Sequence, residues 1–180
     1  MGTIQDIESR IEKYRSGPAN GRVLAIGELA ALIAAAKASG RNVGLCHGCF
    51  DVLHVGHLRH FEAARRICDI LVVTVTADAY VNKGPGRPVF PAEERAELVA
   101  GLAAVDFSAI SHAATAVPLI AQLQPSFFIK GQEYETKAAE VNPNFFLERD
   151  AIEKVGGCVK FTYEWTSSST AAIRRIRNKV

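Results

Sequence analysis

The sequence predicts an α/β protein built on a doubly wound parallel sheet of five strands, and two observations lead to this fold class. Apolar segments of strand length alternate with segments of helical periodicity about five times along the 180 residues. The segment ILVVTV at 70–75 is rich in β-branched residues, which is typical of a strand covered on both faces. Strands that alternate with helices form right-handed βαβ units, so the strands are expected to run parallel.

The first 20 residues are predicted to form a helical extension, and residues 21–180 the main domain. A helix is expected over 3–15, because apolar residues recur there every three or four positions. The sequence Ser-Gly-Pro at 16–18 ends this helix. The residues of its apolar face are Ile4, Ile7, Ile11 and Tyr14.

Six further helices are predicted from composition and periodicity. Residues 27–38 are rich in alanine and are followed by Ser-Gly, which ends a helix. Residues 55–67 place apolar side chains on one face. Pro91, with two glutamates close behind it, is typical of the first turn of a helix over 91–104. The remaining helices are expected at 115–123, 144–155 and 168–178.

Five strands fill the gaps between these helices. They are expected at 43–47, 70–75, 107–110, 126–130 and 158–163. Residues 77–90 hold two glycines and two prolines and are predicted to form a long loop. Ligands of such sheets bind beyond the carboxyl ends of the strands, where the strand order changes. The functional site is therefore expected in the segments that directly follow the strands.

Composition argues against several classes of partner. The net charge of +2 is too small to indicate a nucleic-acid-binding surface. The longest apolar stretch, 24–36, contains Glu28 and is too short to span a membrane. The first 15 residues lack the apolar core of a signal peptide. Four cysteines without such a signal are expected to be reduced thiols, so we expect a cytoplasmic protein without nucleic-acid or membrane partners.

Histidines are concentrated after the first main-domain strand. Four of the five lie within 14 residues, at 47, 54, 57 and 60. His54 and His57 are three residues apart, which places both rings near one face of a first helical turn. That turn exposes backbone N–H groups that bind anions, and Gly48 allows close approach of a ligand to the backbone. A single histidine here is more often a satisfied cap, but the combination predicts a phosphate site.

The segment HGCFDVLHVGH at 47–57 resembles the signature of the nucleotidyltransferase superfamily (cytidylyltransferase-like, with an HxGH motif). Three further segments resemble its bacterial sugar-phosphate branch, and within it the D-glycero-β-D-manno-heptose 1-phosphate adenylyltransferases. The first is RPVFPAEER at 87–95 together with AVD at 104–106. The second is FIKGQEY at 128–134, and the third is TSSST at 166–170. Gln132 and Glu133 replace the usual Gly-Asp, and 141–149 is longer and more aromatic than the branch pattern.

The resemblance implies a Rossmann-like fold and transfer of a nucleotidyl group, most closely AMP from ATP, to a sugar 1-phosphate such as heptose 1-phosphate. The products would be an NDP-sugar and pyrophosphate, and Mg²⁺ would accompany the triphosphate. A separate sugar kinase and a homodimer are also implied, with the N-terminal helix and residues 145–147 available for an interface. One alternative is a cytidylyltransferase that makes a CDP-alcohol such as CDP-glycerol. Alternatives of another class are a non-catalytic nucleotide-binding module and a zinc-binding interaction protein.

Position in the chain and the resemblance together assign roles to single residues. The expected catalytic residues are His54, His57, Arg87 and Lys130. The residues expected to bind nucleotide are Gly48, Cys49, Phe50, Gly56, Lys83, Arg95, Gly131, Ser168, Ser169 and Thr170. The residues expected to contact the acceptor are Asp51, Glu133 and Tyr134. No protein ligands to a metal ion are expected.

Several of these residues also have structural explanations. Lys83 and Arg87 lie on a loop that can simply face solvent. Arg95 can pair with a neighbouring glutamate, and Asp51 can order a histidine or backbone amides. The hydroxyl residues at 168–170 are ordinary N-cap types.

The four cysteines lie at positions 46, 49, 68 and 158. Cys46 and Cys49 have Cys-x-x-Cys spacing, which leaves zinc binding or redox chemistry as an alternative to a structural role. No second pair follows, which favours the structural role. Cys68 and Cys158 are expected to be small core residues.

Overall fold

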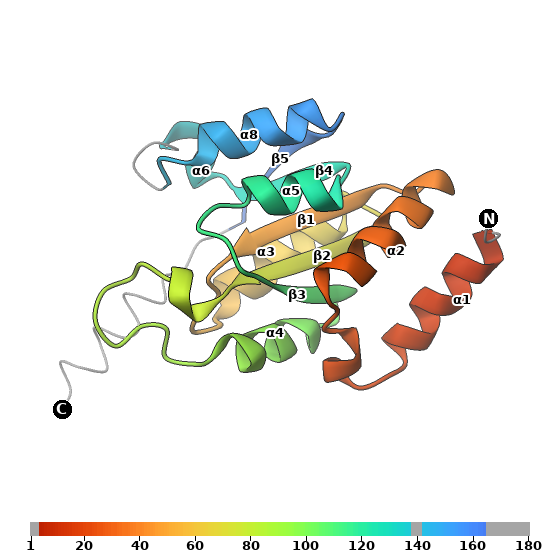
Figure 1. Cartoon of the computed structure of the whole chain (residues 1–180), viewed down its shortest axis with the longest axis horizontal. Helices are drawn as coiled ribbons and strands as arrows, with labels where there is room; N and C mark the ends of the chain where they lie inside the picture. The colour runs from red at the N-terminus through yellow and green to blue at the C-terminus, as the bar shows by residue number, and fades with distance from the viewer. Residues whose placement is uncertain (1–3, 138–141, 165–180) are drawn as a thin grey trace.

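Five parallel strands form one sheet in the order β3-β2-β1-β4-β5 (Figure 1). The structure is a computed structural model, which describes residues 4–137 and 142–164. The strands are β1 (Val43–Gly48), β2 (Ile70–Thr76), β3 (Phe107–Ser111), β4 (Phe127–Gly131) and β5 (Cys158–Thr162). The parallel sheet and its strand order confirm the predicted doubly wound, Rossmann-like fold.

The strand order reverses between β1 and β4. The β1 strand pairs with β2 over its whole length, from Val43 opposite Ile70 to Gly48 opposite Val75. On its other side β1 pairs with β4. The first six residues of β2 are buried, as its β-branched sequence predicts. The carboxyl ends of β1 and β4 therefore flank the position where a doubly wound sheet binds its ligands.

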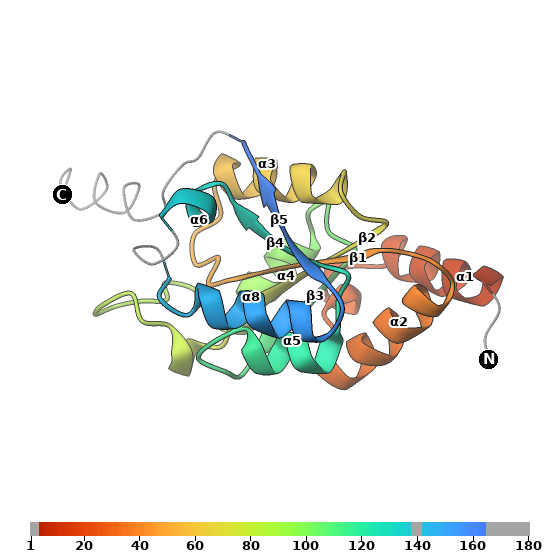
Figure 2. The same ribbon diagram turned by 90° about the horizontal axis from the view of Figure 1, so that it is seen from above.

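Helices cover both faces of the sheet (Figure 2). One face packs against α2 (Ile26–Ala38), α5 (Val117–Leu123) and α8 (Phe145–Lys154). The other face packs against α3 (Val55–Arg65) and α4 (Ala92–Ala100). Each face buries its own hydrophobic cluster, as expected when crossover helices cover both sides of a parallel sheet.

The N-terminal segment is tied to the main domain. Its helix α1 (Ile4–Arg15) and the 3₁₀ helix η1 (Ala19–Arg22) precede α2. Ile11 is buried in the cluster that α2 helps to form. Arg15 donates a 2.6 Å hydrogen bond from Nε to the buried carboxylate of Asp106. The segment thus contributes both apolar and charged contacts to the fold.

Most predicted elements occur within two residues of the expected bounds, and the exceptions have local causes. The helix expected over 91–104 ends at Ala100, because Gly101 and a tight turn follow it. The predicted loop 77–90 contains a 3₁₀ helix, η2 (Asp78–Tyr80). A short helix that was not predicted, α6 (Glu133–Thr136), follows β4. The helix expected at 168–178 lies outside the described residues. No helix in the described ranges has both the length and the apolar character of a membrane span.

Candidate active site

A cavity of about 460 Å³ opens at the carboxyl ends of β1 and β4. Eleven of the residues predicted for the site line it. They are Gly48, Cys49, Phe50, His54, Gly56, His57, Lys83, Lys130, Gly131, Glu133 and Tyr134. Five further residues complete the wall: His47, His60, Ile129, Thr162 and Glu164. Segments that are far apart in the sequence therefore meet where the strand order changes.

His54 and His57 lie where the chain enters α3. Their imidazole rings stack, with centroids 3.8 Å apart and planes 20° from parallel. Both Nδ1 atoms are buried and have no hydrogen-bond partner among the residues that the structure describes. A buried nitrogen without a partner carries a desolvation cost that a bound ligand can remove. The first turn of α3 adds backbone N–H groups, which bind anions.

Both of these rings are held in the neutral form near neutral pH. Burial, followed by the charges of His54, His60 and Lys83, lowers the pKa of His57 to about 3. Burial and the Lys83 ammonium lower the pKa of His54. Lys83 therefore acts electrostatically on both rings from the opposite loop. A neutral imidazole still donates one hydrogen bond, so either ring can donate to a phosphate oxygen.

His47 and His60 belong to the same wall, although neither was assigned a role from the sequence. His47 Nδ1 lies 2.9 Å from the hydroxyl of Thr74, and His60 Nδ1 lies 2.7 Å from the hydroxyl of Thr162. Burial is the main cause that lowers the pKa of His47 to about 3 and that of His60 to about 4. The clustering of four histidines in the sequence could have indicated that His47 and His60 belong to the site. Their hydrogen-bond partners could not be predicted, because Thr74 and Thr162 lie on strands that are distant in sequence.

Phe50 shapes the wall beside His57. Its backbone is left-handed, with φ of 47°, a conformation that bulky residues rarely adopt and that is found preferentially at functional sites. Its ring makes edge contacts with His57 and Phe61, at centroid distances of 5.3 and 5.1 Å. A Cβ atom at Gly48 would lie only 3.1 Å from the Phe50 ring. Part of the space expected at Gly48 for a ligand is therefore used by this ring.

Lys130 is the penultimate residue of β4 and is buried beside an acidic side chain that was not predicted for the site. Its Nζ lies 3.4 Å from Oε2 of Glu148, a buried residue of α8. Burial lowers the pKa of Lys130, and the Glu148 carboxylate opposes this shift. The Lys130 ammonium also lies 4.8 Å from the ring centroid of Tyr134. Burial raises the pKa of Tyr134 to about 12, so its hydroxyl stays protonated.

Glu133 contributes an unpaired oxygen to the cavity wall. Its Oε2 atom is buried and has no hydrogen-bond partner in the described part of the chain. The carboxylate packs against Gly131, where an added Cβ atom would lie 2.7 Å from Cδ of Glu133. Gly131 is thus the residue that leaves room for this carboxylate. A carboxylate oxygen accepts hydrogen bonds, so it suits a hydroxyl or amino group of a ligand.

A second cavity, of about 170 Å³, adjoins the first. The two share the wall formed by His47, Gly48, Cys49, Lys83, Lys130 and Tyr134. The smaller cavity is otherwise lined by Thr76, Tyr80, Val81, Asn82, Ala114, Asn142 and Glu148. Its amides, hydroxyls and carboxylate are groups that bind hydroxyl-rich molecules.

Asp51, Arg87 and Arg95 line neither of these cavities. Asp51 is buried and accepts hydrogen bonds from the Arg87 side chain and from the backbone N–H of Val89, the latter at 2.5 Å. Asp51, which was predicted to contact the acceptor, thus bonds here to the loop that carries Arg87 and Val89. Arg87 is held in the same ion pair, and its Nη2 atom is buried with no partner among the described residues.

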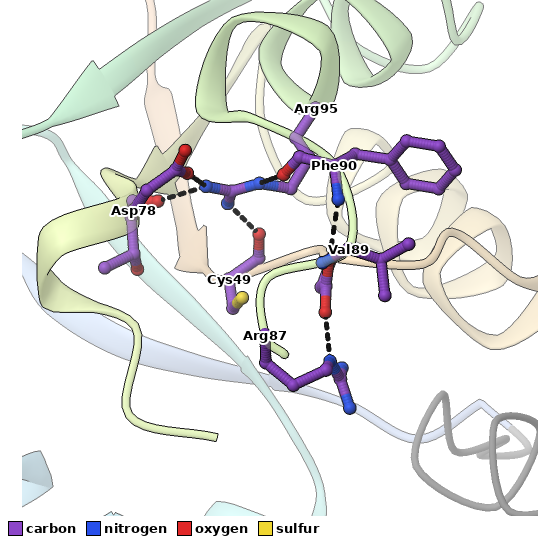
Figure 3. A network of polar contacts seen from close by, with 8 residues as sticks. Cys49, Asp78, Arg87, Val89, Phe90 and Arg95 are labelled. Atoms are coloured by element: carbon purple, nitrogen blue, oxygen red, sulfur yellow. Dashed lines mark hydrogen bonds and ion pairs between the residues drawn. The ribbon is translucent and has the colours of Figure 1, made fainter. Parts of the chain in front are cut away.

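The Arg95 side chain is fully buried and bonded to the protein itself. Nε donates to the carbonyl of Phe90, Nη1 to that of Cys49 and Nη2 to that of Thr76 (Figure 3). Nη2 also pairs with the Asp78 carboxylate at 2.5 Å. The guanidinium therefore ties together the segments that follow β1 and β2. The neighbouring glutamates, considered as partners from the sequence, do not take this role.

The cysteines differ in environment. Cys46 is fully buried in β1, and burial raises its pKa, as it also raises that of Cys49. Cys68 is buried as expected, whereas Cys158 is exposed because β5 is an edge strand. Within residues 4–137 and 142–164, no group of three or more His, Cys, Asp or Glu side chains is arranged to hold a metal ion. The predicted phosphate-binding residues Ser168, Ser169 and Thr170 lie outside the described residues.

Comparisons with known proteins agree with this architecture. The sequence model of the family described as cytidylyltransferase-like matches residues 45–176. The bifunctional protein HldE of Pseudomonas fluorescens is 36% identical over an alignment that covers 99% of this chain and 37% of that protein. HldE of Sulfurimonas denitrificans is 33% identical over 97% of this chain and 35% of its own length. The chain thus spans about a third of the length of these relatives.

The fold is also found in a solved structure. The crystal structure of the lipopolysaccharide core biosynthesis protein from Thermoplasma volcanium matches 72% of this chain and 100% of that chain, with a TM-score of 0.56 and 24% identity. The match of the family model begins within β1, extends past β5 and includes all the described residues that line the larger cavity. The chain belongs to the cytidylyltransferase-like family.

Proposed function

We propose that this protein is a nucleotidyltransferase that transfers AMP from ATP to a sugar 1-phosphate, with heptose 1-phosphate as the acceptor. One observation carries the proposal: the stacked rings of His54 and His57, with unpartnered Nδ1 atoms, lie at the start of α3 in a cavity that also receives Lys83 and Lys130. This is a site built for an extended polyanion. The choice of ATP and of the heptose rests on the sequence likeness to the sugar-phosphate branch.

The chemistry requires alignment and charge stabilisation. An oxygen of the sugar phosphate attacks the α-phosphorus of ATP. The bond breaks between that phosphorus and the oxygen that bridges the α- and β-phosphates. Pyrophosphate leaves with the electron pair of that bond. The attacking oxygen is already anionic near neutral pH, so the reaction needs no general base. His54 and His57 donate hydrogen bonds to triphosphate oxygens, where negative charge grows as pyrophosphate leaves.

We assign the triphosphate to the larger cavity and the acceptor to the smaller one. The cations Lys83 and Lys130 line both cavities, so each can reach phosphate groups of either substrate. The amide of Asn82 and the hydroxyl of Thr76 line only the smaller cavity, where they suit the hydroxyls of a sugar. Glu133, whose buried Oε2 atom has no hydrogen-bond partner among the described residues, lines the larger cavity.

Magnesium fits this site as an ion carried by the substrate. Mg²⁺ keeps much of its water and is bound through few carboxylates together with phosphate oxygens. Glu133 would supply a carboxylate to such an ion, since its buried Oε2 atom has no hydrogen-bond partner in the described part of the chain. The ion would neutralise charge on the triphosphate.

The proposed reaction also implies partners. A sugar 1-phosphate is made by phosphoryl transfer to a sugar, so we infer that a sugar kinase supplies the acceptor. We further propose a homodimer, for which α8 offers the exposed side chains of Phe146 and Leu147, whereas Phe145 is buried in the core. Sedimentation equilibrium of the wild type and a Leu147→Glu variant tests the dimer, which the variant should dissociate.

The test of the function is pyrophosphate release with Mg²⁺ from ATP and from CTP. Each nucleotide is combined with heptose 1-phosphate or glycerol 3-phosphate, and His57→Ala is the control variant. Release from ATP and heptose 1-phosphate, lost in the variant, is the expected result. Release only from CTP and glycerol 3-phosphate would instead establish a CDP-alcohol synthase. ATP binding measured by calorimetry, without release from any pair, would favour a non-catalytic nucleotide-binding module.

A further inference from the structure

Lys130 brings a positive charge to the boundary between the two cavities. Its side chain lines both of them and is buried. The ammonium lies 4.5 Å from the ring centroid of Phe128 and 4.8 Å from that of Tyr134. Aromatic faces attract a cation, but they do not replace the hydration that the ammonium loses on burial. A charged Lys130 therefore needs an anionic partner inside the protein.

Glu148 is that partner, and it is fixed from two sides. Its Oε2 atom lies 3.4 Å from Nζ of Lys130 and accepts a 3.3 Å hydrogen bond from the Asn142 amide. Its Oε1 atom accepts a 3.1 Å hydrogen bond from the backbone N–H of Ala116, directly before α5. The carboxylate is 2% exposed. Because these bonds hold the carboxylate independently of the lysine, its position determines where the ammonium lies.

Other titratable groups around the ammonium do not form an ion pair with it among the described residues. The titratable groups that lie in electrostatic or ring contact with Lys130 come from β1, α3, α6 and α8. They are Cys46, His47, His60, Glu133, Tyr134 and Glu148. Only Glu148 has an oxygen within ion-pair distance. Burial lowers the pKa of Lys130, and Glu148 opposes this most strongly.

We propose that Glu148 is a positioning residue that holds the Lys130 ammonium at the boundary between the triphosphate and the acceptor. The assignment rests on the proposed function. The α-phosphate and the acceptor phosphate are both anions and repel each other as they approach. An ammonium held between the two cavities lowers this repulsion, and it does so only if it stays charged and in place.

The first test reads Lys130 directly and does not depend on turnover. The protein is labelled with lysine carrying ¹³C at Cε, and the Lys130 signal is assigned by its loss in Lys130→Arg. The wild type is expected to show the ammonium form at pH 7. In Glu148→Gln, which keeps an amide oxygen for the Ala116 N–H, the titration midpoint should fall by about one pH unit or more. A neutral amine in the wild type, or an unchanged midpoint in the variant, would overturn the proposal.

The second test separates positioning from a purely structural role. Glu148→Gln is expected to lower kcat/KM for the acceptor by up to about 10²-fold, the effect of a displaced catalytic group. Glu148→Asp, which keeps the charge on a shorter side chain, should recover part of this loss. Glu153→Gln, an exposed position on the same helix, is the matched control. If Glu148 only stabilised the start of α5, Glu148→Gln would match the wild type in rate and in titration.

The two tests also keep failures apart. If no substrate pair reacts but the Lys130 midpoint moves in Glu148→Gln, the proposed function fails and the ion pair stands. If the enzyme reacts as proposed and neither readout changes in Glu148→Gln, the function stands and the positioning role is wrong. Circular dichroism of each variant establishes that the fold is retained, and the wild-type titration is informative even if a variant does not fold.

Discussion

The fully buried guanidinium of Arg95 lies 2.5 Å from the carboxylate of Asp78, whose side chain is 46% exposed. The two ends of this ion pair therefore have different consequences for the fold. Arg95 also donates to three backbone carbonyl groups: that of Cys49 after β1, that of Thr76 at the end of β2 and that of Phe90 before α4. If the ion pair were broken, the Asp78 carboxylate could be solvated by water. The three carbonyl groups, in contrast, would lose a charged hydrogen-bond donor. The arginine thus orders the loops beside the cavity from outside it.

This asymmetry predicts unequal costs of substitution. Arg95→Met, which roughly preserves volume, should lower the free energy of unfolding by about 3–5 kcal/mol, as expected for loss of one partner of a buried ionic network. Asp78→Asn should lower it by about 1 kcal/mol or less, as for a surface ion pair. Urea denaturation of the two variants and the wild type measures both. Equal losses would show that the ion pair, and not the carbonyl contacts, carries the stabilisation.

The example of Arg95 shows which parts of the site could be read from the sequence. His54 and His57 were predictable because their relationship is local: three residues apart, directly after a strand. The fold was predictable for a similar reason, since alternation of apolar strands and helices requires no long-range information. Arg95 also carries a local signal, a cation in the first turns of a helix. That signal indicates a partner but not its identity, and the carbonyl groups that bind it come from other segments.

Glu148 illustrates what local patterns omit. It lies 18 positions after Lys130 on a helix whose buried face is set by packing against α5, β5 and β4. Glutamate on a helix is usually solvated, so nothing in the surrounding sequence predicts its burial. Cys158 shows the converse: it occupies an apolar-looking strand, but that strand is at the edge of the sheet and leaves it exposed.

Loss of either stacked histidine should lower the rate of nucleotidyl transfer. His54→Ala and His57→Ala are each expected to reduce kcat by about 10²–10³-fold, because each removes a donor to charge that develops on the leaving group. The double variant should lose less than the product of the two factors, since the rings act as one unit. Steady-state pyrophosphate release measures all three variants. His112→Ala, an exposed histidine outside both cavities, is the control. A rise in nucleotide KM with unchanged kcat would indicate binding without transition-state stabilisation.

The buried histidines predict a loss of stability in acid. Folding lowers the pKa of His47 and His57 from 6.5 to about 3 and that of His60 to about 4. Below pH 6.5 the unfolded chain binds protons that the folded chain does not, so acid favours unfolding. Stability should be highest above 6.5 and fall as the pH decreases toward 4, by at most about 1.4 kcal/mol per pH unit for each histidine.

Urea denaturation at a series of pH values measures this dependence. His60→Gln, whose amide can still bond the Thr162 hydroxyl, should make the decline below pH 6.5 shallower. His112→Gln, at an exposed position, should leave the slope of the wild type unchanged. An identical slope in His60→Gln would mean that the burial of this histidine does not control acid stability.

A methyl group at Gly131 should disturb the site more than the fold. In Gly131→Ala the new Cβ atom would collide with the Glu133 carboxylate, the end of a side chain that can move away. We therefore expect a change in the free energy of unfolding of no more than about 1 kcal/mol. Displacement of the carboxylate should raise the KM of one substrate by about 10-fold, the equivalent of one lost hydrogen bond.

Gly27→Ala provides the matched control for this prediction. Gly27 lies near the start of α2, and a Cβ atom there would meet nothing within 4 Å. That variant should be unchanged in activity and equally or more stable, because alanine favours the helix. If Gly131→Ala raises KM by displacing Glu133, the double variant Gly131→Ala/Glu133→Ala should have the same KM as the single variant Glu133→Ala. A further rise would show that Gly131 itself contacts the substrate through its backbone.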